Sequence, residues 1–269
     1  MSDPTAQLEW SLRRWLERLG GALETRYGVP EVVGENLARL VAMARAGLDA
    51  QPEAVNVLDL GINLGYTAAC LQTMYAAQST MLVGLEHPSR SLVGTRDWAT
   101  MRRELGLLAV GGDAFDLPFQ DDVFDVVFAG EIIEHLSPTK LLSRFFPEVT
   151  RVLRGGGVLC LSTPNFACAL NRILFLCWGR TSMDVPAPQD GHTFGHVREY
   201  TLGELGTLLQ LAGLEVVSRG TADRRRGWVR RRRLVRLVDA LEHHLGRVRP
   251  RLRGFIVMAA RSPMPGSSR

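Results

Sequence analysis

The stretch Phe124-Asp-Val-Val-Phe-Ala-Gly-Glu131-Ile-Ile-Glu134-His135-Leu136 decides the fold of this chain. It begins as an apolar run with the composition of a buried strand and ends in two carboxylates and an imidazole. Spacings of three and four residues from Glu131 predict that these groups share one face of a helical turn. Ligands of open α/β sheets bind beyond the carboxyl ends of the strands, so we expect Glu131, Glu134 and His135 to form part of a binding site.

Strand-like and helix-like patterns alternate along the chain, which predicts a mainly parallel α/β sheet covered on both faces. The expected strands comprise residues 55–60, 81–86, 107–111, 124–129, 157–162, 214–218 and 254–260. The expected helices comprise residues 66–77, 89–104, 138–153, 201–212 and a segment near 234–247. Glycines 155–157 should form a turn between a helix and the fifth strand.

The pattern also predicts how the chain is organised. Residues 6–19 and 31–48 have the spacing of amphipathic helices, so residues 1–50 should form an N-terminal helical cap. Residues 51–269 should form one larger domain. Two long connections, 164–198 and 219–250, should be insertions in it, and the first should arch over the strand ends.

Composition and charge narrow the class of protein. With 269 residues, 46% hydrophobic and 22% charged, the chain can bury a large core and is expected to be globular. Its formal charge of +4 is modestly basic, and seven arginines lie between Arg224 and Arg233. Such a run can meet phosphates or acidic lipid headgroups, or it can form a solvated face.

Cysteine usage and hydropathy predict a cytoplasmic protein. The four cysteines show no C-x-x-C pair and no metal-type spacing, which favours a reducing compartment, and the first residues lack a signal-like apolar segment. The most apolar segment, Leu170–Trp178, is flanked by Arg172 and Arg180 and is too short to span a membrane. This segment fits ordinary core, the roof of a pocket, or a segment that lies on a membrane surface, so peripheral membrane contact is one of the expected alternatives.

A glycine-rich turn follows the first strand. Asp59 precedes Gly61 and Gly65, and glycines there let the backbone approach a ligand while the carboxylate accepts hydrogen bonds from it. The dinucleotide pattern G-x-G-x-x-G would require glycine at Asn63 and Tyr66, so a pyrophosphate site is disfavoured. No G-x-x-x-x-G-K-[ST] run supports nucleoside triphosphate hydrolysis.

Two further acidic positions follow the second and third strands. Glu86 ends the second strand about twenty residues beyond the glycines, where a carboxylate can bind the hydroxyls of a ribose. Asp113 and Ala114 follow the third strand and could bind an exocyclic amine and a ring nitrogen. Asp113 fits the role of an Asx-turn residue equally well.

Together, these motifs resemble the class I S-adenosylmethionine-dependent methyltransferases from about residue 54 onward. The resemblance implies a Rossmann-like, doubly wound, seven-stranded sheet whose last strand, near 255–260, is antiparallel. It implies S-adenosyl-L-methionine as cofactor, bound by Asp59, Gly61, Asn63, Gly65, Glu86, Asp113 and Ala114. The family usually has a second glycine where this chain has Asn63, so the loop path near that residue is an open point.

The E-x-x-E-H pattern is similar to two subgroups, the ubiquinone-biosynthesis O-methyltransferases and the small-RNA 3′-terminal 2′-O-methyltransferases. That similarity implies Mg²⁺ or Mn²⁺ at Glu131, Glu134, His135 and His196, with His135, Glu131 and His196 as catalytic residues. Such an ion would orient a hydroxyl and lower its pKa. The alternative is that the helix dipole favours the glutamates and that His135 is a base that needs no metal.

The first functional hypothesis is methyl transfer to a hydroxyl of a small-molecule, sugar or lipid-linked acceptor. Terminal 2′-O-methylation of RNA is the alternative that the arginine run favours, although the chain has no recognisable RNA-binding module. An NAD-dependent dehydrogenase or epimerase is disfavoured by the missing G-x-G-x-x-G pattern and Tyr-x-x-x-Lys pair. A non-catalytic module with the same pocket is the fourth hypothesis, and the oligomeric state stays open.

Overall fold

The computed structural model describes residues 29–63, 65–74, 80–88, 96–183, 187–189, 192–224 and 233–264. Most of the expected N-terminal cap, residues 1–28, and most of the arginine run, residues 225–232, lie outside the described residues. None of the described helices has the length and apolar content that crossing a membrane requires.

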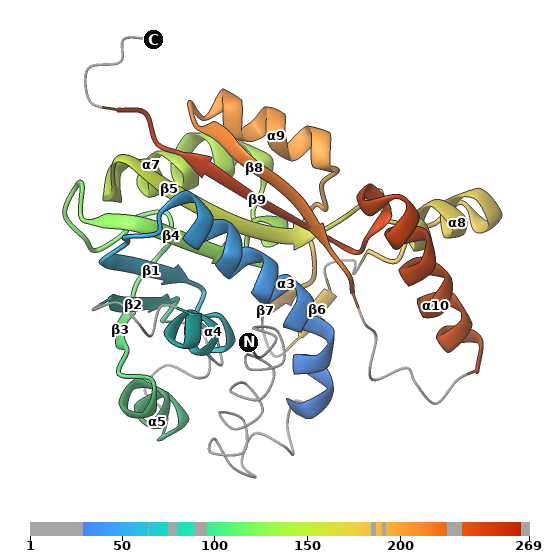
Figure 1. Ribbon diagram of the computed structural model, residues 1–269, viewed down its shortest axis with the longest axis horizontal. Coiled ribbons are helices and arrows are strands. Elements are labelled where there is room, and N and C mark those ends of the chain that lie inside the picture. Colours follow the sequence, from blue (N-terminus) through green and yellow to red (C-terminus); the bar gives the residue numbers. More distant parts are fainter. Residues whose placement is uncertain are drawn as a thin grey trace.

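A seven-stranded sheet with the order β3-β2-β1-β4-β5-β9-β8 forms the centre of the molecule (Figure 1). Its strands are β1 (Asn56–Leu60), β2 (Met81–Glu86), β3 (Leu108–Gly111), β4 (Phe124–Gly130), β5 (Leu153–Pro164), β8 (Glu215–Ala222) and β9 (Phe255–Arg261). Strands β1 to β5 pair in parallel, whereas β9 is antiparallel to both of its neighbours. The predicted seven-stranded sheet with an antiparallel last strand is confirmed.

Helices cover both faces of this sheet. The first face carries α3 (Val29–Ala50), α4 (Tyr66–Met74) and α5 (Arg96–Glu104). The second carries α6 (Pro138–Lys140), the π-helical turn η2 (Leu141–Phe145), α7 (Phe146–Val152) and α9 (Leu202–Leu211). Beyond the sheet lie η1 (Ile133–His135), α8 (Ala169–Trp178), the hairpin β6 (Ala187–Gln189) and β7 (His192–Phe194), α10 (Arg233–Val248) and η4 (Pro250–Leu252).

Alternation along the central strands explains why two helical layers form. Val126 and Phe128 of β4 pack in the cluster that contains α3 and α4, whereas Val127 and Ala129 pack in the cluster that contains α7 and α9. All four side chains are fully buried. Because successive residues of a strand point to opposite faces, a strand that is apolar at every position requires cover on both sides. The doubly wound architecture follows from this pattern.

Three local expectations were wrong or incomplete. Glycines 155–157 do not form a turn ahead of the fifth strand, because β5 already begins at Leu153. Leu153 pairs with Phe124, but the next pair is Val158 with Val126, so the glycines bulge out of the ladder, with Gly156 at φ +78°. The single helix expected at 138–153 contains a π-helical turn in its middle. The helix α8 and the hairpin β6–β7 lie inside the predicted insertion 164–198.

Candidate active site at the carboxyl end of the sheet

The glycine-rich loop after β1 is built from left-handed backbone. Gly61, Asn63 and Gly65 have φ values of +65°, +45° and +72°. A Cβ atom at Gly61 would lie 3.0 Å from Cδ1 of Ile132. The loop therefore lies against the turn that carries Glu131 and Glu134, and Asn63 occupies a conformation that glycine favours and that asparagine tolerates better than most residues. Asn63 therefore has the kind of backbone conformation that glycine would adopt at this position.

Two buried carboxylates lie beside this loop. Glu86 accepts a hydrogen bond from the Asn63 N–H at 2.8 Å and another from the His87 N–H at 3.0 Å, so it holds the loop in place. Asp59 is 1% exposed, and its Oδ2 atom has no hydrogen-bond partner in the described part of the chain. Burial, with a smaller contribution from the charge of Glu86, raises the pKa of Asp59 to about 8, and Arg39 opposes this shift.

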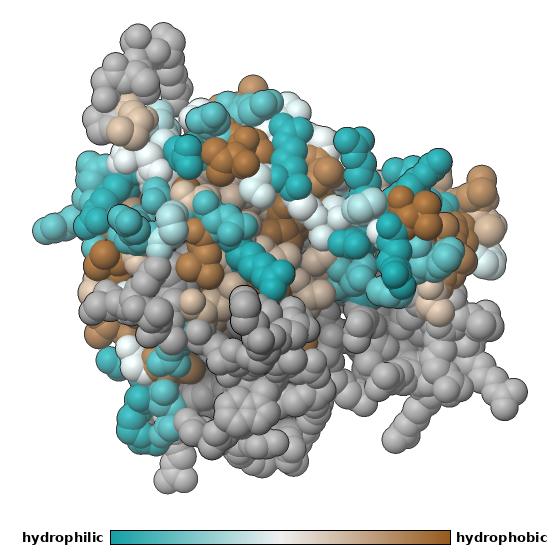
Figure 2. Space-filling model, viewed as in Figure 1, coloured by the Kyte–Doolittle hydropathy of each residue, from teal (hydrophilic) through white to brown (hydrophobic). Residues whose placement is uncertain are grey.

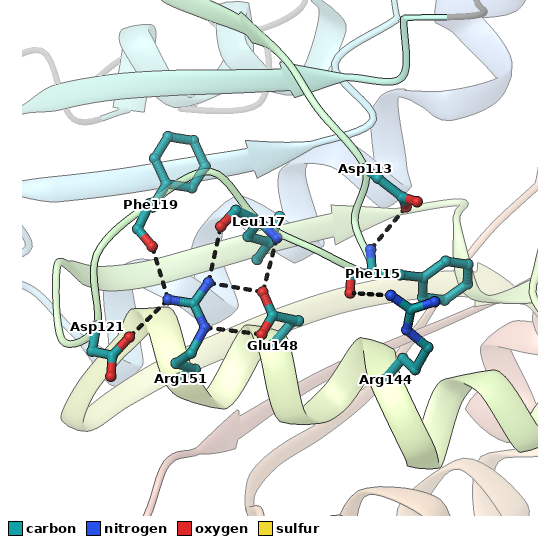
Figure 3. A network of polar contacts seen from close by, with 8 residues as sticks. All are labelled: Asp113, Phe115, Leu117, Phe119, Asp121, Arg144, Glu148 and Arg151. Atoms are coloured by element: carbon teal, nitrogen blue, oxygen red, sulfur yellow. Dashed lines mark hydrogen bonds and ion pairs between the residues drawn. The ribbon is translucent and has the colours of Figure 1, made fainter.

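The segment expected to contact a purine ring is a tight, braced turn (Figure 3). Asp113 accepts a hydrogen bond from the Phe115 N–H at 2.9 Å, as an Asx-turn residue does, and Asp113 and Asp116 form a β-bridge. Arg144 donates to the Phe115 carbonyl at 3.3 Å. The structure therefore gives Asp113 the turn role that the sequence left open, and a ligand contact by Asp113 or Ala114 stays a prediction.

Arg151 fixes the connection that leads from this turn to β4. Its guanidinium donates to the carbonyls of Leu117 and Phe119 at 2.9 and 2.8 Å, and it pairs with Glu148 and Asp121 at 2.8 and 2.7 Å (Figure 3). Glu148 accepts from the Leu117 N–H at 2.8 Å in turn. The connection is therefore bound to α7 through one arginine and one glutamate, which holds the Asp113 turn at the edge of the sheet.

The turn after β4 differs from the expected helical face. Glu131 has φ +56°, and its N–H donates to the Ser162 carbonyl at 3.0 Å. The only helical residues that follow directly are those of the short 3₁₀ turn η1, Ile133–His135. The prediction that Glu131 shares a helical face with Glu134 and His135 was wrong, because its left-handed backbone places it outside that turn.

Arg39 reaches this site from α3, and the sequence reasoning missed it. Arg39 is 6% exposed, and its guanidinium donates to the Ser162 hydroxyl at 2.9 Å and lies 3.9 Å from Oε1 of Glu131. Burial raises the pKa of Glu131, and the positive charge of Arg39 opposes that shift. A lone arginine in the apolar stretch from Leu37 to Ala44 was the signal available in the sequence, because an isolated charge is rarely buried unless it is paired.

Glu134 holds the distant insertion against η1. Its backbone carbonyl accepts from the N–H groups of Val197 and Arg198 at 2.7 and 3.1 Å, which brings the neighbouring His196 to η1. The side chain is fully buried, and its Oε2 accepts from the Thr163 hydroxyl at 3.0 Å, while Oε1 has no partner in the described residues. Burial and the nearby Glu131 raise the pKa of Glu134 well above its ordinary value.

Glu134, His135 and His196 converge. One ligand atom from each lies within 4.8 Å of the others, and the two imidazole centroids are 5.1 Å apart. Glu131, the fourth residue of the expected metal set, is not part of this group. The structure thus brings three of the four predicted residues together, whereas the carboxylate of Glu131 lies near Arg39.

Both imidazoles are oriented through Nδ1. Nδ1 of His135 lies 2.9 Å from the Gly195 carbonyl, and Nδ1 of His196 lies 2.9 Å from Oε1 of Glu199. A carbonyl oxygen can only accept, so Nδ1 of His135 donates, and Nε2 is the nitrogen that can take a proton or bind an ion. Hydrogen bonds of this kind commonly orient histidines that ligate metals.

Tyr200, which the sequence reasoning did not single out as a site residue, lies in the same region. Its side chain is 1% exposed, and its hydroxyl has no hydrogen-bond partner among the residues described. Burial raises the pKa of this hydroxyl. The ring lies 5.5 Å from the guanidinium carbon of Arg198, and the Tyr200 carbonyl accepts from the Phe166 N–H at 2.9 Å. Tyr200 therefore anchors the end of the insertion that delivers His196.

Comparison with known proteins gives consistent matches. A family model described as a methyltransferase domain matches residues 58–161. A Mycolicibacterium smegmatis protein described as a probable S-adenosylmethionine-dependent methyltransferase is 32% identical over 219 residues, which cover 80% of this chain and 70% of that protein. A Mycobacterium tuberculosis H37Rv protein with the same description is 31% identical over 160 residues, or 60% of this chain, and the match spans only 48% of that relative.

A solved structure has the same fold over most of its length. The Burkholderia thailandensis 1,6-didemethyltoxoflavin-N1-methyltransferase, solved with bound 1,6-didemethyltoxoflavin and S-adenosylhomocysteine, aligns with a TM-score of 0.55. The alignment covers 90% of this chain and 87% of that one at 16% identity. At this identity the match supports the fold alone.

Proposed function

Because the chain belongs to the class I S-adenosylmethionine-dependent methyltransferases, we propose that it transfers a methyl group to a hydroxyl of a small-molecule, sugar or lipid-linked acceptor. The observation that carries this proposal is the convergence of Glu134, His135 and His196. Ile132, two residues before Glu134, lies against Gly61 of the glycine-rich loop. A cofactor in that loop and an acceptor at the cluster would therefore be adjacent.

The residues of the cofactor pocket fit S-adenosylmethionine, which supplies an electrophilic methyl group on a positively charged sulfur. Asp59 offers a buried carboxylate oxygen without a partner in the described structure, which suits a cationic ligand. Glu86 keeps lone pairs for ribose hydroxyls, although it already accepts two backbone hydrogen bonds. Holding two reactants in line is a large part of catalysis, so a preformed loop is an advantage.

His135 is the proposed base. Its Nδ1 donates to the Gly195 carbonyl, so the neutral ring carries its lone pair on Nε2. In the proposed step, Nε2 accepts the proton of the acceptor hydroxyl while that oxygen becomes the nucleophile. General-base help of this kind typically contributes about 10²–10⁴-fold to the rate. Loss of the ring should therefore reduce turnover much more than it reduces cofactor binding.

The same three residues fit a divalent cation. Glu134 contributes a buried carboxylate with one oxygen lacking a partner in the described residues, and both histidines are oriented through Nδ1. Mn²⁺ suits this mixed set of oxygen and nitrogen ligands better than Mg²⁺, which prefers oxygen. A bound ion would polarise the acceptor hydroxyl. Nε2 of His135 cannot be ligand and base at once, so the two versions of the proposal are distinguishable.

The proposal can be tested by measuring turnover with labelled S-adenosylmethionine. The acceptors should be compared in two groups, one that offers hydroxyls and one that offers amines. Hydroxyl acceptors should become labelled, whereas label found only on amines would contradict the choice of oxygen. His135→Gln should lose about 10²-fold or more in turnover, while His243→Gln, which alters an exposed histidine paired with Asp223, should stay active.

Chelation and titration calorimetry with Mn²⁺ then distinguish a metal-assisted mechanism from one in which His135 acts as a base without a metal. Chelator-sensitive activity that Mn²⁺ restores, with heat of binding that His196→Gln abolishes, would support an ion at the cluster. Activity that resists the chelator, without heat of binding, would leave His135 as a metal-free base.

A further inference from the structure

The last turn of α8 exposes large apolar side chains. Phe175, Leu176 and Trp178 are 65%, 86% and 66% exposed, whereas Ala169 and Asn171 at the start of the same helix are buried. Hydrophobic residues gather at the right-hand end of the molecule in Figure 2, where Figure 1 places α8, with hydrophilic residues among them. Single exposed apolar residues are common on proteins, but three together at the end of one helix mark an interaction surface.

This tip is held rigidly. Gly179 ends the helix with φ +63°, and its N–H donates to the Phe175 carbonyl at 2.9 Å. The buried Asn171 accepts hydrogen bonds from the N–H and the hydroxyl of Ser182 at 2.9 and 2.6 Å and donates to the Phe166 carbonyl at 3.0 Å. The chain that leaves α8 is thereby fixed to its first turn, which holds the last turn of the helix in place. The three apolar side chains are distributed around the end of the helix, because successive residues of an α-helix are about 100° apart.

The surroundings of the tip are positively charged. Arg172 and Arg180 flank it and are exposed, and the segment from Phe166 to Met183 contains no acidic residue. Helix α10 packs against α8, and three exposed arginines lie at its end and in η4: Arg247, Arg249 and Arg251. An apolar projection flanked by Arg172 and Arg180, on a helix that packs against the arginine-bearing α10, complements a surface that is apolar inside and anionic at its rim.

We propose that the tip of α8, defined as Phe175, Leu176 and Trp178, inserts into the headgroup boundary of a membrane that contains anionic lipids. Aromatic and leucine side chains would enter the acyl boundary while the arginines would stay at the phosphate level. A helix of ten residues is too short to cross a bilayer, so it would lie at the interface.

Insertion would also orient the site. Helix α8 follows the carboxyl end of β5, the same edge of the sheet at which Glu134, His135 and His196 converge. A membrane-bound molecule would therefore present this edge close to the lipid surface. The inference goes beyond methyl transfer and does not depend on the identity of the acceptor.

Vesicle flotation tests the inference with the full chain. The protein should float with vesicles of phosphatidylcholine and phosphatidylglycerol, bind phosphatidylcholine alone more weakly, and lose binding as salt increases. Replacement of Phe175, Leu176 and Trp178 by serine should weaken binding by about tenfold or more. Leu211→Ser is the matched control, because Leu211 is 68% exposed on α9 and lies outside the proposed surface.

Cys177 provides a second measurement at the tip itself. It is exposed, whereas Cys70, Cys160 and Cys168 are buried, so a thiol-reactive, environment-sensitive dye should label Cys177 selectively. Anionic vesicles should shift the emission of that dye to the blue, and nitroxide-labelled lipids should quench it.

Three results would overturn the inference. The first is the absence of binding to anionic vesicles, and the second is equal binding by the triple serine variant and the parent chain. The third is a parent chain that is dimeric in solution and a triple serine variant that is monomeric, which would assign the tip to contact between copies of the chain. Stabilisation of the triple variant by S-adenosylhomocysteine, equal to that of the parent chain, would show that the variant still folds.

Discussion

At the scale of single residues, Asn63 shows how the chain replaces a glycine. Its φ of +45° lies in the left-handed region, where asparagine is tolerated and β-branched residues are strained. Asn63→Val should lower the free energy of unfolding by about 1–2 kcal/mol. Asn63→Gly should leave it nearly unchanged. Urea denaturation of the two variants checks this, and equal losses in both would contradict the conformational explanation.

Asp59 predicts a pH dependence of stability. Its pKa is raised from 3.8 to about 8 in the folded chain, so the folded state binds the proton more tightly than the unfolded state does. The stabilising contribution of the protonated group is complete below about pH 4 and is lost as the pH rises towards 8. Asp59→Asn should therefore flatten the stability profile over this range in chemical denaturation. Parallel profiles for the two proteins would refute the assignment.

The sequence predicted those residues of the candidate site that have an ionisable side chain and follow the apolar run of a strand. Asp59 and Glu86 lie at the ends of β1 and β2, Glu134 lies in the turn that follows β4, and all three are buried. Arg39 was missed because its role depends on how α3 crosses the sheet, which no local pattern encodes. The left-handed backbone of Glu131 was missed for a related reason, because glutamate gives no sign of a positive φ.

At the scale of elements, α9 has a well-capped N-terminus but contains two glycines, Gly203 and Gly206, which have low helix propensity. Thr201 and Glu204 form a reciprocal capping box, with hydrogen bonds of 3.2 and 2.9 Å. Gly203 is exposed, and a Cβ atom there would have no neighbour within 4 Å. Gly203→Ala should raise the free energy of unfolding by about 0.5–1 kcal/mol.

Gly206 is the matched comparison in the same helix. A Cβ atom there would lie 3.2 Å from Nη2 of Arg219, so the steric cost offsets the gain in helix propensity. Gly206→Ala should therefore stabilise the protein less than Gly203→Ala does. Thermal unfolding of the two variants measures the difference, and an equal gain in both would contradict this steric explanation.

The strands were predictable because their periodicity is a property of the local sequence. The predicted 81–86 is identical to β2, and the predicted 124–129 differs from β4 by one residue at its end. The start of β5 was missed because a glycine bulge in a ladder looks like a turn when its partner strand is unknown. The helix α8 was noticed only as an apolar run, since nothing local distinguishes a projecting helix from a buried one.

At the scale of the whole molecule, the sheet separates two hydrophobic layers, and the glycine-rich loop that follows β1 is the proposed place of the cofactor. A ligand bound there stabilises only the folded chain. S-adenosylhomocysteine at about 100 times its Kd should therefore raise the free energy of unfolding by about 2.7 kcal/mol. Differential scanning fluorimetry measures the shift, with NAD as the control ligand.

Substitutions test which residues cause the stabilisation by S-adenosylhomocysteine. Glu86→Ala should reduce the shift with S-adenosylhomocysteine, whereas Glu215→Gln, at the start of β8, should preserve it. An unchanged melting temperature with S-adenosylhomocysteine, or an equal shift with NAD, would contradict the cofactor assignment.

The carbonyl of Glu134 has a consequence for protein engineering. Its bonds to the N–H groups of Val197 and Arg198 use backbone atoms alone, and the Phe166 N–H is held in the same way by the Tyr200 carbonyl. The side chains of Val197 and Arg198, both exposed, can therefore be exchanged without loss of the bonds that hold His196 beside η1. If the proposed acceptor binds at the cluster, libraries that vary these two positions would alter the surroundings of the acceptor while Glu134, His135 and His196 stay in place.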